Sequence, residues 1–391
     1  MLLKNCIVNI PGFKLKEVKG SNPLILKVTY HKKLRCISCQ SKDLRKKASF
    51  IRQVQHETIG PRRTCLEFTS HKFYCRTCGC YFNQQFPGIG KHQRATERLQ
   101  KQVFHQHTQG VSQQALAKDF KVGKATIERW YHKRYQLEYR EHKGAPYPQV
   151  LGMDEHFFNK KQGYATTFCD LRKHKIFDVV KGCSARDLKA YLEQLPGKER
   201  VKVICIDLSS RYRSLIKHYF PNAKIVADRF HVIRLMQHVC LKTYQEIDPE
   251  MKHQRGLLAC LRTKPNNLSV KQHIKRDAYL KQQPAIGAIY QFQQRFYRVL
   301  MKKTMTAKRC KRIIPLFLKM IKELKQSPFK RLITLGKTRY QWRDEVVRMW
   351  RFSKSNGITE GFHRKMKLIQ RRAYGFRNFE NYRLRVKVLW A

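Results

Sequence analysis

The segment that decides the fold is Val201-Lys202-Val203-Ile204-Cys205-Ile206-Asp207, a short apolar run that ends on a carboxylate. Its length and its β-branched side chains are typical of a buried strand. Around it, from residue 149 to residue 231, strand-like and helix-like segments follow in the order β-β-β-α-β-α-β-α. The other segments are Gln149–Met153, Gly163–Asp170, Lys175–Lys181, Ser184–Leu195, Ser210–Phe220, Ala223–Ala227 and a long helix opened by Asp228. This order predicts an α/β sheet with antiparallel and parallel parts.

The chain changes character on both sides of this sheet. A polar linker with proline and glycine, residues 141–148, precedes it. Residues 232–350 are rich in Leu, Lys, Gln and Arg and show almost no strand pattern, which predicts helices inserted into the domain. A final helix is expected to begin near Asn356 and to carry Glu360.

The first ninety residues show the pattern of short strands, with two Cys-x-x-Cys pairs. The pairs are Cys36/Cys39 and Cys75/Cys78, and 35 residues lie between them. Two such knuckles at the tips of hairpins predict a zinc ribbon, in which four thiolates hold one Zn²⁺. Cys80 is a competing ligand, and four unrelated free cysteines are the alternative. The remaining eight of the thirteen cysteines are scattered singly and are expected to be small buried side chains.

A helix-turn-helix is predicted after the ribbon. A helix over 94–108 is followed by one that Ser112 caps, by a turn at Val122-Gly123, and by a basic aromatic helix from Lys124 to Arg134. This last helix is the candidate for the major groove of DNA. Its candidate DNA-binding residues are Lys124, Thr126, Arg129, Lys133 and Arg134, whereas Trp130 and Tyr131 are expected in the helical core. A helical hairpin without DNA-binding function is the alternative.

The net charge of the chain indicates which kind of molecule it binds. Among 391 residues, 83 Lys and Arg face 27 Asp and Glu, a formal net charge of +56. Such a charge disfavours a compact fold unless a polyanion neutralises it, and nucleic acid is the usual one. No apolar run is long enough to span a bilayer, and the N-terminus lacks the pattern of a secretory signal. We therefore expect a cytoplasmic protein without disulfides.

Carboxylates are scarce and hence informative. Only six acidic residues lie between 251 and 391, and Glu360 is one of them. Asp154 and Asp207 are each expected at a strand end, where ligands of open α/β sheets gather. Together with Glu360 they could hold two Mg²⁺ ions, with Mn²⁺ as a substitute, for phosphoryl transfer. The alternative for Asp207 is a helix N-cap.

Four motifs carry a family resemblance. They are Gly152-Met153-Asp154-Glu155, the segment Ile206–Tyr212, the segment Phe220–Val232 with its Asp-Arg-Phe-His-Val run, and Ser355–His363 followed by the Ala-Tyr-Gly-Phe run in 371–378. In these motifs, and in the ribbon and helix-turn-helix before them, the chain resembles the bacterial insertion-sequence DDE transposases of the ISL-three family.

The resemblance implies an RNase H-like catalytic domain, interrupted by an all-α insertion and preceded by a β zinc ribbon and an α helix-turn-helix domain. It implies Asp154, Asp207 and Glu360 as the metal-binding triad, with Asp228 as the alternative second aspartate and Glu155 in a supporting role. The expected domains are a ribbon over 1–90, a helix-turn-helix over 91–146, a catalytic domain over 147–231 and 351–391, and the insertion over 232–350.

Further contacts to DNA are expected near the C-terminus. His363 and Arg364 are candidates for phosphate. Aromatic and arginine side chains alternate after residue 370, where Tyr374, Phe376, Phe379 and Tyr382 either stack on unpaired bases or pack in the core. The candidate DNA-binding residues of this region are Arg364, Arg371, Arg372 and Arg377.

These inferences converge on a transposase that binds the terminal inverted repeats of double-stranded DNA, cleaves a strand and joins the resulting 3′-OH to target DNA. Synapsis of two ends predicts a homodimer or a higher oligomer; neither a membrane nor a small-molecule substrate is expected. The competing functions are a DNA-binding regulator without catalysis, which would use only the N-terminal modules, and an RNase H-like nuclease, which would cleave without joining.

Overall fold

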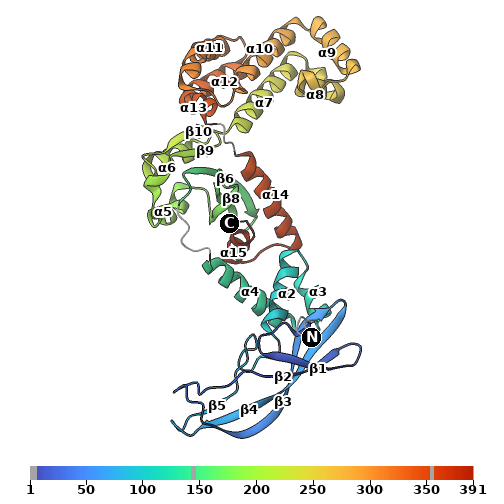
Figure 1. Ribbon diagram of the computed structural model, residues 1–391. Helices are drawn as coiled ribbons and strands as arrows, with labels where there is room; N and C mark the ends of the chain where they lie inside the picture. Colours follow the sequence, from blue (N-terminus) through green and yellow to red (C-terminus); the bar gives the residue numbers. More distant parts are fainter. Residues whose placement is uncertain (1–6, 142–146, 353–355, 391) are drawn as a thin grey trace. The chain divides into compact units, whose positions relative to one another are not determined.

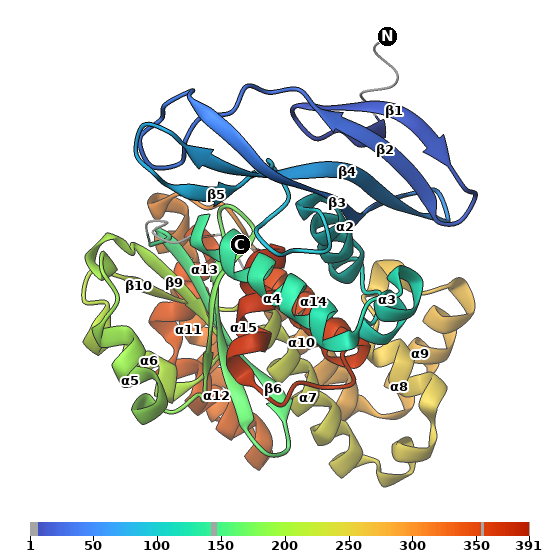
Figure 2. The same ribbon diagram turned by 90° about the horizontal axis from the view of Figure 1, so that it is seen from below.

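A computed structural model describes residues 7–141, 147–352 and 356–390. The chain divides into two compact units, residues 1–141 and 142–391, which are described here one at a time. Figure 1 labels the elements of each unit, and Figure 2 shows them from a second direction. No helix within the described ranges is both long and apolar enough to cross a membrane.

The N-terminal unit begins with a five-stranded sheet in the order β1-β2-β4-β3, with β5 paired to β4. Its strands are β1 (Phe13–Lys19), β2 (Leu24–Tyr30), β3 (Leu44–Ile59), β4 (Arg62–Cys75) and β5 (Tyr81–Asn83). The expectation of short strands is wrong for β3 and β4, which have 16 and 14 residues. They form one long hairpin, paired from Leu44 opposite Cys75 to Ile59 opposite Arg62 with two shifts of register. This hairpin accounts for the long segment between the two cysteine pairs.

The sheet is followed by the helices α2 (Glu97–Thr108), α3 (Gln113–Phe120) and α4 (Lys124–Glu141). Thr96 and Ser112 cap α2 and α3, each accepting a hydrogen bond from a backbone N–H in the first turn. Lys121 ends α3 in the left-handed conformation and turns the chain into α4. The predicted helix-turn-helix is therefore α3 and α4, with α2 packed against both.

The C-terminal unit is built on a second sheet in the order β10-β9-β6-β7-β8. Its strands are β6 (Val150–Asn159), β7 (Gly163–Asp170), β8 (Lys175–Lys181), β9 (Val203–Ile206) and β10 (Lys224–Ala227). Strands β6, β7 and β8 are antiparallel, while β9 and β10 run parallel to β6. The predicted mixture of antiparallel and parallel pairing is confirmed.

One strand end was predicted wrongly, and the error concerns the candidate site. Asp154 was expected to end its strand, but β6 continues for five residues beyond it, to Asn159. Pairing with β9 stops at Gly152, whereas pairing with β7 continues to Asn159 opposite Gly163. Asp154 therefore lies inside β6, just past the end of its parallel neighbour.

Helices cover both faces of this sheet. On one face, α5 (Ala185–Glu193), α6 (Ser210–Tyr219) and α7 (Arg229–Ile247) share a core with the strands. On the other, α14 (Gly357–Arg372) and α15 (Phe379–Trp390) pack on strand residues such as Cys169 and Val179. Ser184 caps α5 in a reciprocal pair with Asp187, as its sequence predicts.

Between α7 and α14 the described chain is helical, as its composition predicts. The α-helices are α8 (Arg255–Arg262), α9 (Val270–Gln282), α10 (Pro284–Leu300), α11 (Ala307–Lys325), α12 (Lys330–Gln341) and α13 (Arg343–Arg351). Short 3₁₀ helices span Lys198–Arg200, Pro249–His253 and Pro265–Asn267. The buried side chains of α10 to α13 belong to the same core as one face of the sheet.

A buried carboxylate fixes the C-terminal helix to the sheet. Asp178 on β8 accepts hydrogen bonds from Arg383 at 2.8 and 2.9 Å and from Lys387 at 2.9 Å. Burial alone would raise the pKa of Asp178, but the hydrogen bonds and charges of these two cations outweigh it and lower that pKa.

Replacing Asp178 by asparagine should loosen α15. Two partly buried cations would lose their counter-charge, and removing one partner of a buried ion pair costs about 3 kcal/mol or more. The free energy of opening of α15, measured by native-state hydrogen exchange, should fall by about that amount. Glu380→Gln removes only an exposed partner of Arg383 and should leave it unchanged. Equal protection of α15 in both variants would contradict this assignment.

The same ion pair predicts a pH dependence. Because the folded pKa of Asp178 is lowered, its contribution is complete above the ordinary carboxyl pKa of about 3.9. It is lost as the pH falls through the lowered folded value. In Asp178→Asn this acid-dependent loss of α15 protection should be absent.

Candidate active site

Asp154 lies on the face of β6 that α14 covers. Its Oδ1 accepts a hydrogen bond from the backbone N–H of Glu155 at 2.9 Å, and its Oδ2 lies 3.9 Å from Nδ1 of His363. Burial raises the pKa of Asp154 to about 7. The charge of His231 lowers this pKa, while the charge of the nearby Asp207 raises it. A cation bound next to such a carboxyl group would stabilise its ionised form.

Asp207 follows β9 directly and faces the same region. Its Oδ1 is buried and has no hydrogen-bond partner among the described residues. Burial raises the pKa of Asp207, and His231 lowers it while Glu155 raises it further. The N-cap of α6 is Ser209, so Asp207 is not the helix cap that the alternative required. An orphaned carboxylate oxygen at a strand end fits a metal ligand.

Asp228, the alternative second aspartate, is fully engaged with the protein. It precedes α7 and is 1% exposed. Its Oδ1 accepts the backbone N–H of Asn356 at 3.1 Å, and its Oδ2 pairs with Nδ1 of His231 at 2.8 Å. This pairing raises the pKa of His231. Asp228 therefore connects the start of α14 to α7 and holds His231 beside the other two aspartates.

Asn356 anchors α14 at the sheet. Its side-chain amide donates to the carbonyl oxygen of Met153 at 2.9 Å, next to Asp154. A side chain at Gly152 would have its Cβ 2.4 Å from Oδ1 of Asn356, so this close approach requires glycine. The start of α14 is thus held against the strand that carries Asp154.

Glu360 lies in the first turn of α14, but its carboxylate does not reach the aspartates. The side chain is 45% exposed and forms an ion pair with Arg364 at 3.0 Å. Over the described ranges, the only group of three or more Cys, His, Asp or Glu ligand atoms within 4.8 Å of one another is a set of four cysteines. The three acids therefore approach one region of the sheet without forming a closed metal site.

Sequence reasoning missed a buried network behind Asp154. Oγ1 of Thr167 forms hydrogen bonds with two histidines, Nε2 of His363 at 3.1 Å and Nδ1 of His156 at 3.0 Å. The other ring nitrogen of His156, Nε2, forms a hydrogen bond with the hydroxyl of Tyr382 at 2.8 Å. Burial lowers the pKa of His363 to about 4 and that of His156 to about 3. The side chain of His363 is only 11% exposed, and its role as a phosphate contact stays a prediction. The spacing of Asp154 and His156 on one strand face was the available signal.

The four predicted zinc ligands meet. Sγ of Cys36 lies 3.5 Å from that of Cys78, and Sγ of Cys39 lies 3.5 Å from that of Cys75. Tetrahedral Zn–S bonds of about 2.3 Å place sulfurs about 3.8 Å apart. The residue after each pair, Gln40 or Gly79, has a positive φ, which turns backbone N–H groups toward the sulfurs. The N–H of Cys39 lowers the pKa of the Cys36 thiol, which favours the thiolate.

Cys80 is not part of this cluster. Its Sγ points to the carbonyl oxygen of Tyr81, at 3.8 Å. The second cysteine pair begins at Cys75, the last residue of β4, and the first lies in the loop between β2 and β3. The donor set of four thiolates fits Zn²⁺.

The candidate recognition helix α4 presents a basic outer face. Lys124, Arg129 and Lys133 are exposed, and Arg129 donates to Oγ1 of Thr126 at 3.0 Å. Arg134 forms an ion pair with Glu138 at 2.7 Å. Tyr131 is buried, as expected, whereas Trp130 is only half-buried.

The C-terminal aromatics divide between core and surface. Phe379 and Tyr382 are buried on the side of α15 that packs on the sheet, so they do not stack on bases. Tyr374 is 96% exposed and has a positive φ. The predicted basic residues of this region, Arg364, Arg371, Arg372 and Arg377, have exposed side chains.

One unit contains a helix-turn-helix and a four-cysteine cluster, and the other is an α/β unit with two neighbouring aspartates. This combination is typical of a DNA-binding protein with an enzyme-like domain. Residues 151–386 match the family described as transposase, and residues 84–135 match the helix-turn-helix domain of transposase family ISL3. The first match covers more than half of the chain. The chain belongs to the ISL3 family of transposases, so the resemblance read from the sequence is confirmed.

A relative of known name is similar over most of the length. The transposase for insertion sequence element IS1001 of Bordetella parapertussis is 26% identical over 366 residues, which are 90% of this chain and 87% of the relative. The chain is thus a DNA transposase, and a regulator without catalysis is not favoured.

Proposed function

We propose that this transposase cleaves and joins DNA with Asp154, Asp207 and Glu360 as its catalytic triad, on an RNase H-like fold. The proposal is supported by the sheet order, with three antiparallel strands followed by two parallel ones. The carboxylates come from the middle of β6, the end of β9 and the first turn of α14. One observation carries it: the buried Oδ1 of Asp207, which has no partner among the residues that the structure describes.

The three carboxylates would hold two Mg²⁺ ions. When bound, these ions activate an attacking hydroxyl and stabilise the leaving oxygen. Asp228 and His231 orient the region through their hydrogen bond, and Asn356 holds α14 in place. For Glu360 to reach the metal site, its carboxylate must first break its ion pair with Arg364. Arg364 is then released to contact phosphate.

The reaction proceeds in two steps at phosphorus. Water first attacks a phosphodiester at the transposon end, so that the P–O3′ bond breaks and the 3′ oxygen leaves as a hydroxyl. That 3′-OH then attacks a phosphodiester of target DNA, which forms a new P–O bond and releases the target's own 3′-OH. Neither step needs a covalent protein intermediate, so no Ser or Tyr nucleophile is required.

The N-terminal modules would recognise the ends. Family ISL3 helix-turn-helix domains imply DNA binding by residues 84–135. We assign base and phosphate contacts to the exposed face of α4, with Lys124, Thr126, Arg129, Lys133 and Arg134. The ribbon over 1–90 would hold Zn²⁺, and synapsis of two ends requires a dimer or a higher oligomer. The other domain boundaries that we propose are 91–146 for the helix-turn-helix, 147–231 and 351–391 for the catalytic domain, and 232–350 for the insertion.

Purified protein should generate strand-transfer products on a plasmid target when given DNA with both element ends and Mg²⁺. The products should disappear with EDTA and return with Mg²⁺ or Mn²⁺. Cleavage without joining would identify a nuclease instead. Binding without any metal-dependent cleavage would identify a regulator, and either result would overturn the proposed function.

A further inference from the structure

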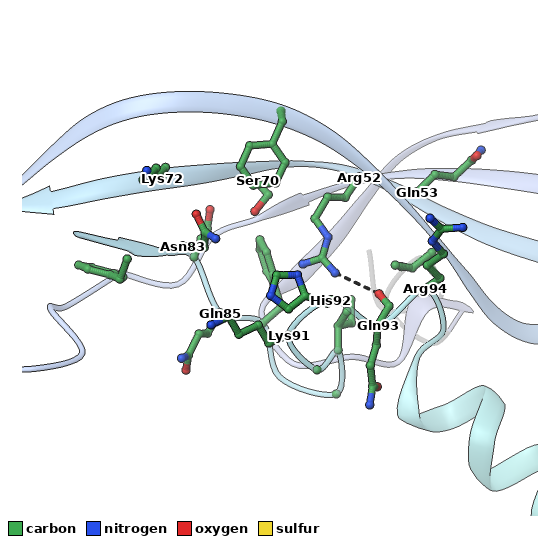
Figure 3. A pocket seen from close by; sticks show the side chains of 18 of the residues that line it. Arg52, Gln53, Ser70, Lys72, Asn83, Gln85, Lys91, His92, Gln93 and Arg94 are labelled. Carbon is green, nitrogen blue, oxygen red and sulfur yellow. Dashed lines mark hydrogen bonds between the residues drawn. The ribbon is translucent and has the colours of Figure 1, made fainter. Parts of the chain in front are cut away.

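A groove in the N-terminal unit has no role in the site described above. It lies between the β3–β4 hairpin, β5 and the segment 83–94, has a volume of ≈ 940 Å³, and is lined only by residues between 37 and 97 (Figure 3). We call it the ribbon groove. Its walls are fixed by the fold: Gln55 donates to the carbonyl oxygen of Arg94 at 2.9 Å, and Arg52 donates to that of Gln93 at 3.1 Å.

The rim of the ribbon groove is cationic. Arg52, Lys72, Lys91 and Arg94 line it, and the labelled side chains of Figure 3 show them on both the strand side and the loop side. Glu97 is the only carboxylate among the described lining residues. Four fixed positive charges against one negative charge favour an anionic ligand, and the spread over two walls suits a chain of phosphates.

The floor of the groove contains two buried polar atoms whose hydrogen-bonding needs phosphate alone does not meet. Ser70 and Gln84 are 1% and 7% exposed, and Oγ of Ser70 and Oε1 of Gln84 find no hydrogen-bond partner in the described part of the chain. An amide carbonyl accepts hydrogen bonds, and a phosphodiester has none to donate. A nucleobase edge offers both donors and acceptors, so a base in the groove would satisfy either atom once its side chain turns toward the groove.

Aromatic side chains complete the walls. Phe50 lies opposite Ser70 in the β3–β4 register and is 41% exposed, while Tyr81 is 57% exposed with Lys72 over its ring. A basic groove with exposed aromatic rings is the arrangement that binds single-stranded nucleic acid, because the rings stack on unpaired bases. In a duplex the ring faces of each base are stacked and its Watson–Crick edge is paired, so only an unpaired base offers a ring face to these aromatic side chains and a Watson–Crick edge to the floor.

We propose that the ribbon groove binds an unpaired strand of DNA, with its phosphates on the cationic rim and a base directed to Ser70 and Gln84. The proposal rests on the proposed function, because it assigns a second DNA contact to the same transposase. It separates two tasks within the N-terminal unit: α4 takes duplex, and the groove takes a strand that has left the duplex.

The full chain with Lys72→Ala and Lys91→Ala tests the cationic rim. Both side chains are exposed, and Lys14→Ala with Lys16→Ala on β1 removes the same charge from exposed positions outside the groove. Affinity for a single-stranded oligonucleotide and for its duplex should be measured by fluorescence anisotropy across salt concentrations. We expect about 10-fold weaker single-strand binding, and a salt slope smaller by about 1.4 if two phosphate contacts are lost. The control pair should change neither.

Ser70→Ala tests the floor of the groove by two measurements, the thermal midpoint and the single-strand affinity, which a purely structural role of Ser70 would affect differently. Removing a buried hydroxyl without a partner should leave the thermal midpoint unchanged or higher, because its desolvation penalty is lost. Single-strand binding should nevertheless weaken, by about 5-fold. A lower midpoint with unchanged binding would overturn the proposal.

Two further outcomes keep this test separate from the proposed function. If the Lys72/Lys91 variant and the Lys14/Lys16 control lose single-strand affinity equally, or if duplex affinity falls as much as single-strand affinity, the groove is not a strand site. The proposed function stands in both cases if strand transfer by the unmodified chain persists. If strand transfer fails but the groove variants still lose single-strand affinity selectively, the catalytic proposal fails alone.

Discussion

Asp207→Asn will bind end-containing DNA as tightly as the unmodified chain but will neither cleave nor join it. The substitution keeps the size of the side chain and removes the charge that a cation requires. Loss of a catalytic group of this kind lowers rates by roughly 10⁴-fold. Oδ1 of Asp207 accepts no hydrogen bond within the described structure, so the substitution breaks none at this atom. Single-turnover cleavage with Mg²⁺ measures the rate, and anisotropy measures the binding.

Asp228→Asn is the matched comparison. Both oxygens of Asp228 accept hydrogen bonds from the protein, so this change should disturb His231 and the start of α14. We expect a lower thermal midpoint and a rate reduced by about 10-fold, the effect of about 1.4 kcal/mol in the barrier. If Asp207→Asn cleaves at the full rate while Asp228→Asn is inactive, the triad is wrong and Asp228 is the second catalytic aspartate.

The strand pattern of the C-terminal unit could be predicted because its strands are short, apolar and separated by clear turns. β9 and β10 are buried on both faces, which gives an uninterrupted apolar run. The extent of β6 could not be predicted in this way. Its second half contains Glu155, His156 and Asn159, polar residues that belong in a strand only because β7 pairs with them. Asp154 was therefore placed at a strand end that does not exist.

The same limit applies to the candidate site. Motifs identified the acidic residues, since each stands in a short distinctive segment. Which oxygens are already bound is a tertiary property: Asp228 is engaged by Asn356, 128 residues away in the chain. The ribbon groove could not be predicted from the sequence either, because Arg52, Ser70 and Gln84 come together only through the long β3–β4 hairpin and β5.

We expect the Cys75→Ser chain to bind no zinc at the proposed site, whereas Cys80→Ser should bind one ion per chain. Cys75 contributes one of four sulfurs that lie within 4.8 Å of one another, and Cys80 lies outside this group. Both changes replace a sulfur by an oxygen within the same six residues, so the pair separates ligation from local disturbance. Atomic absorption on the purified full chain measures the metal. Zinc retained in Cys75→Ser, or lost in Cys80→Ser, would contradict the ligand assignment.

The loss of zinc should unfold the knuckles and leave the rest of the sheet intact. Among the described residues, the buried core beside the cysteines consists of Cys36, Phe73, Cys75 and Phe82, with Leu34, Leu44 and Cys80 packed against it at partial burial. That is too little apolar surface to order two loops, and structural zinc supplies about 10 kcal/mol or more in small domains. The other end of the sheet has its own core around Leu26, Leu66 and Phe68. Hydrogen exchange in Cys75→Ser should therefore become fast over 32–44 and 75–83 but stay slow over 24–29 and 64–68; fast exchange throughout the sheet would show that the two cores fold as one.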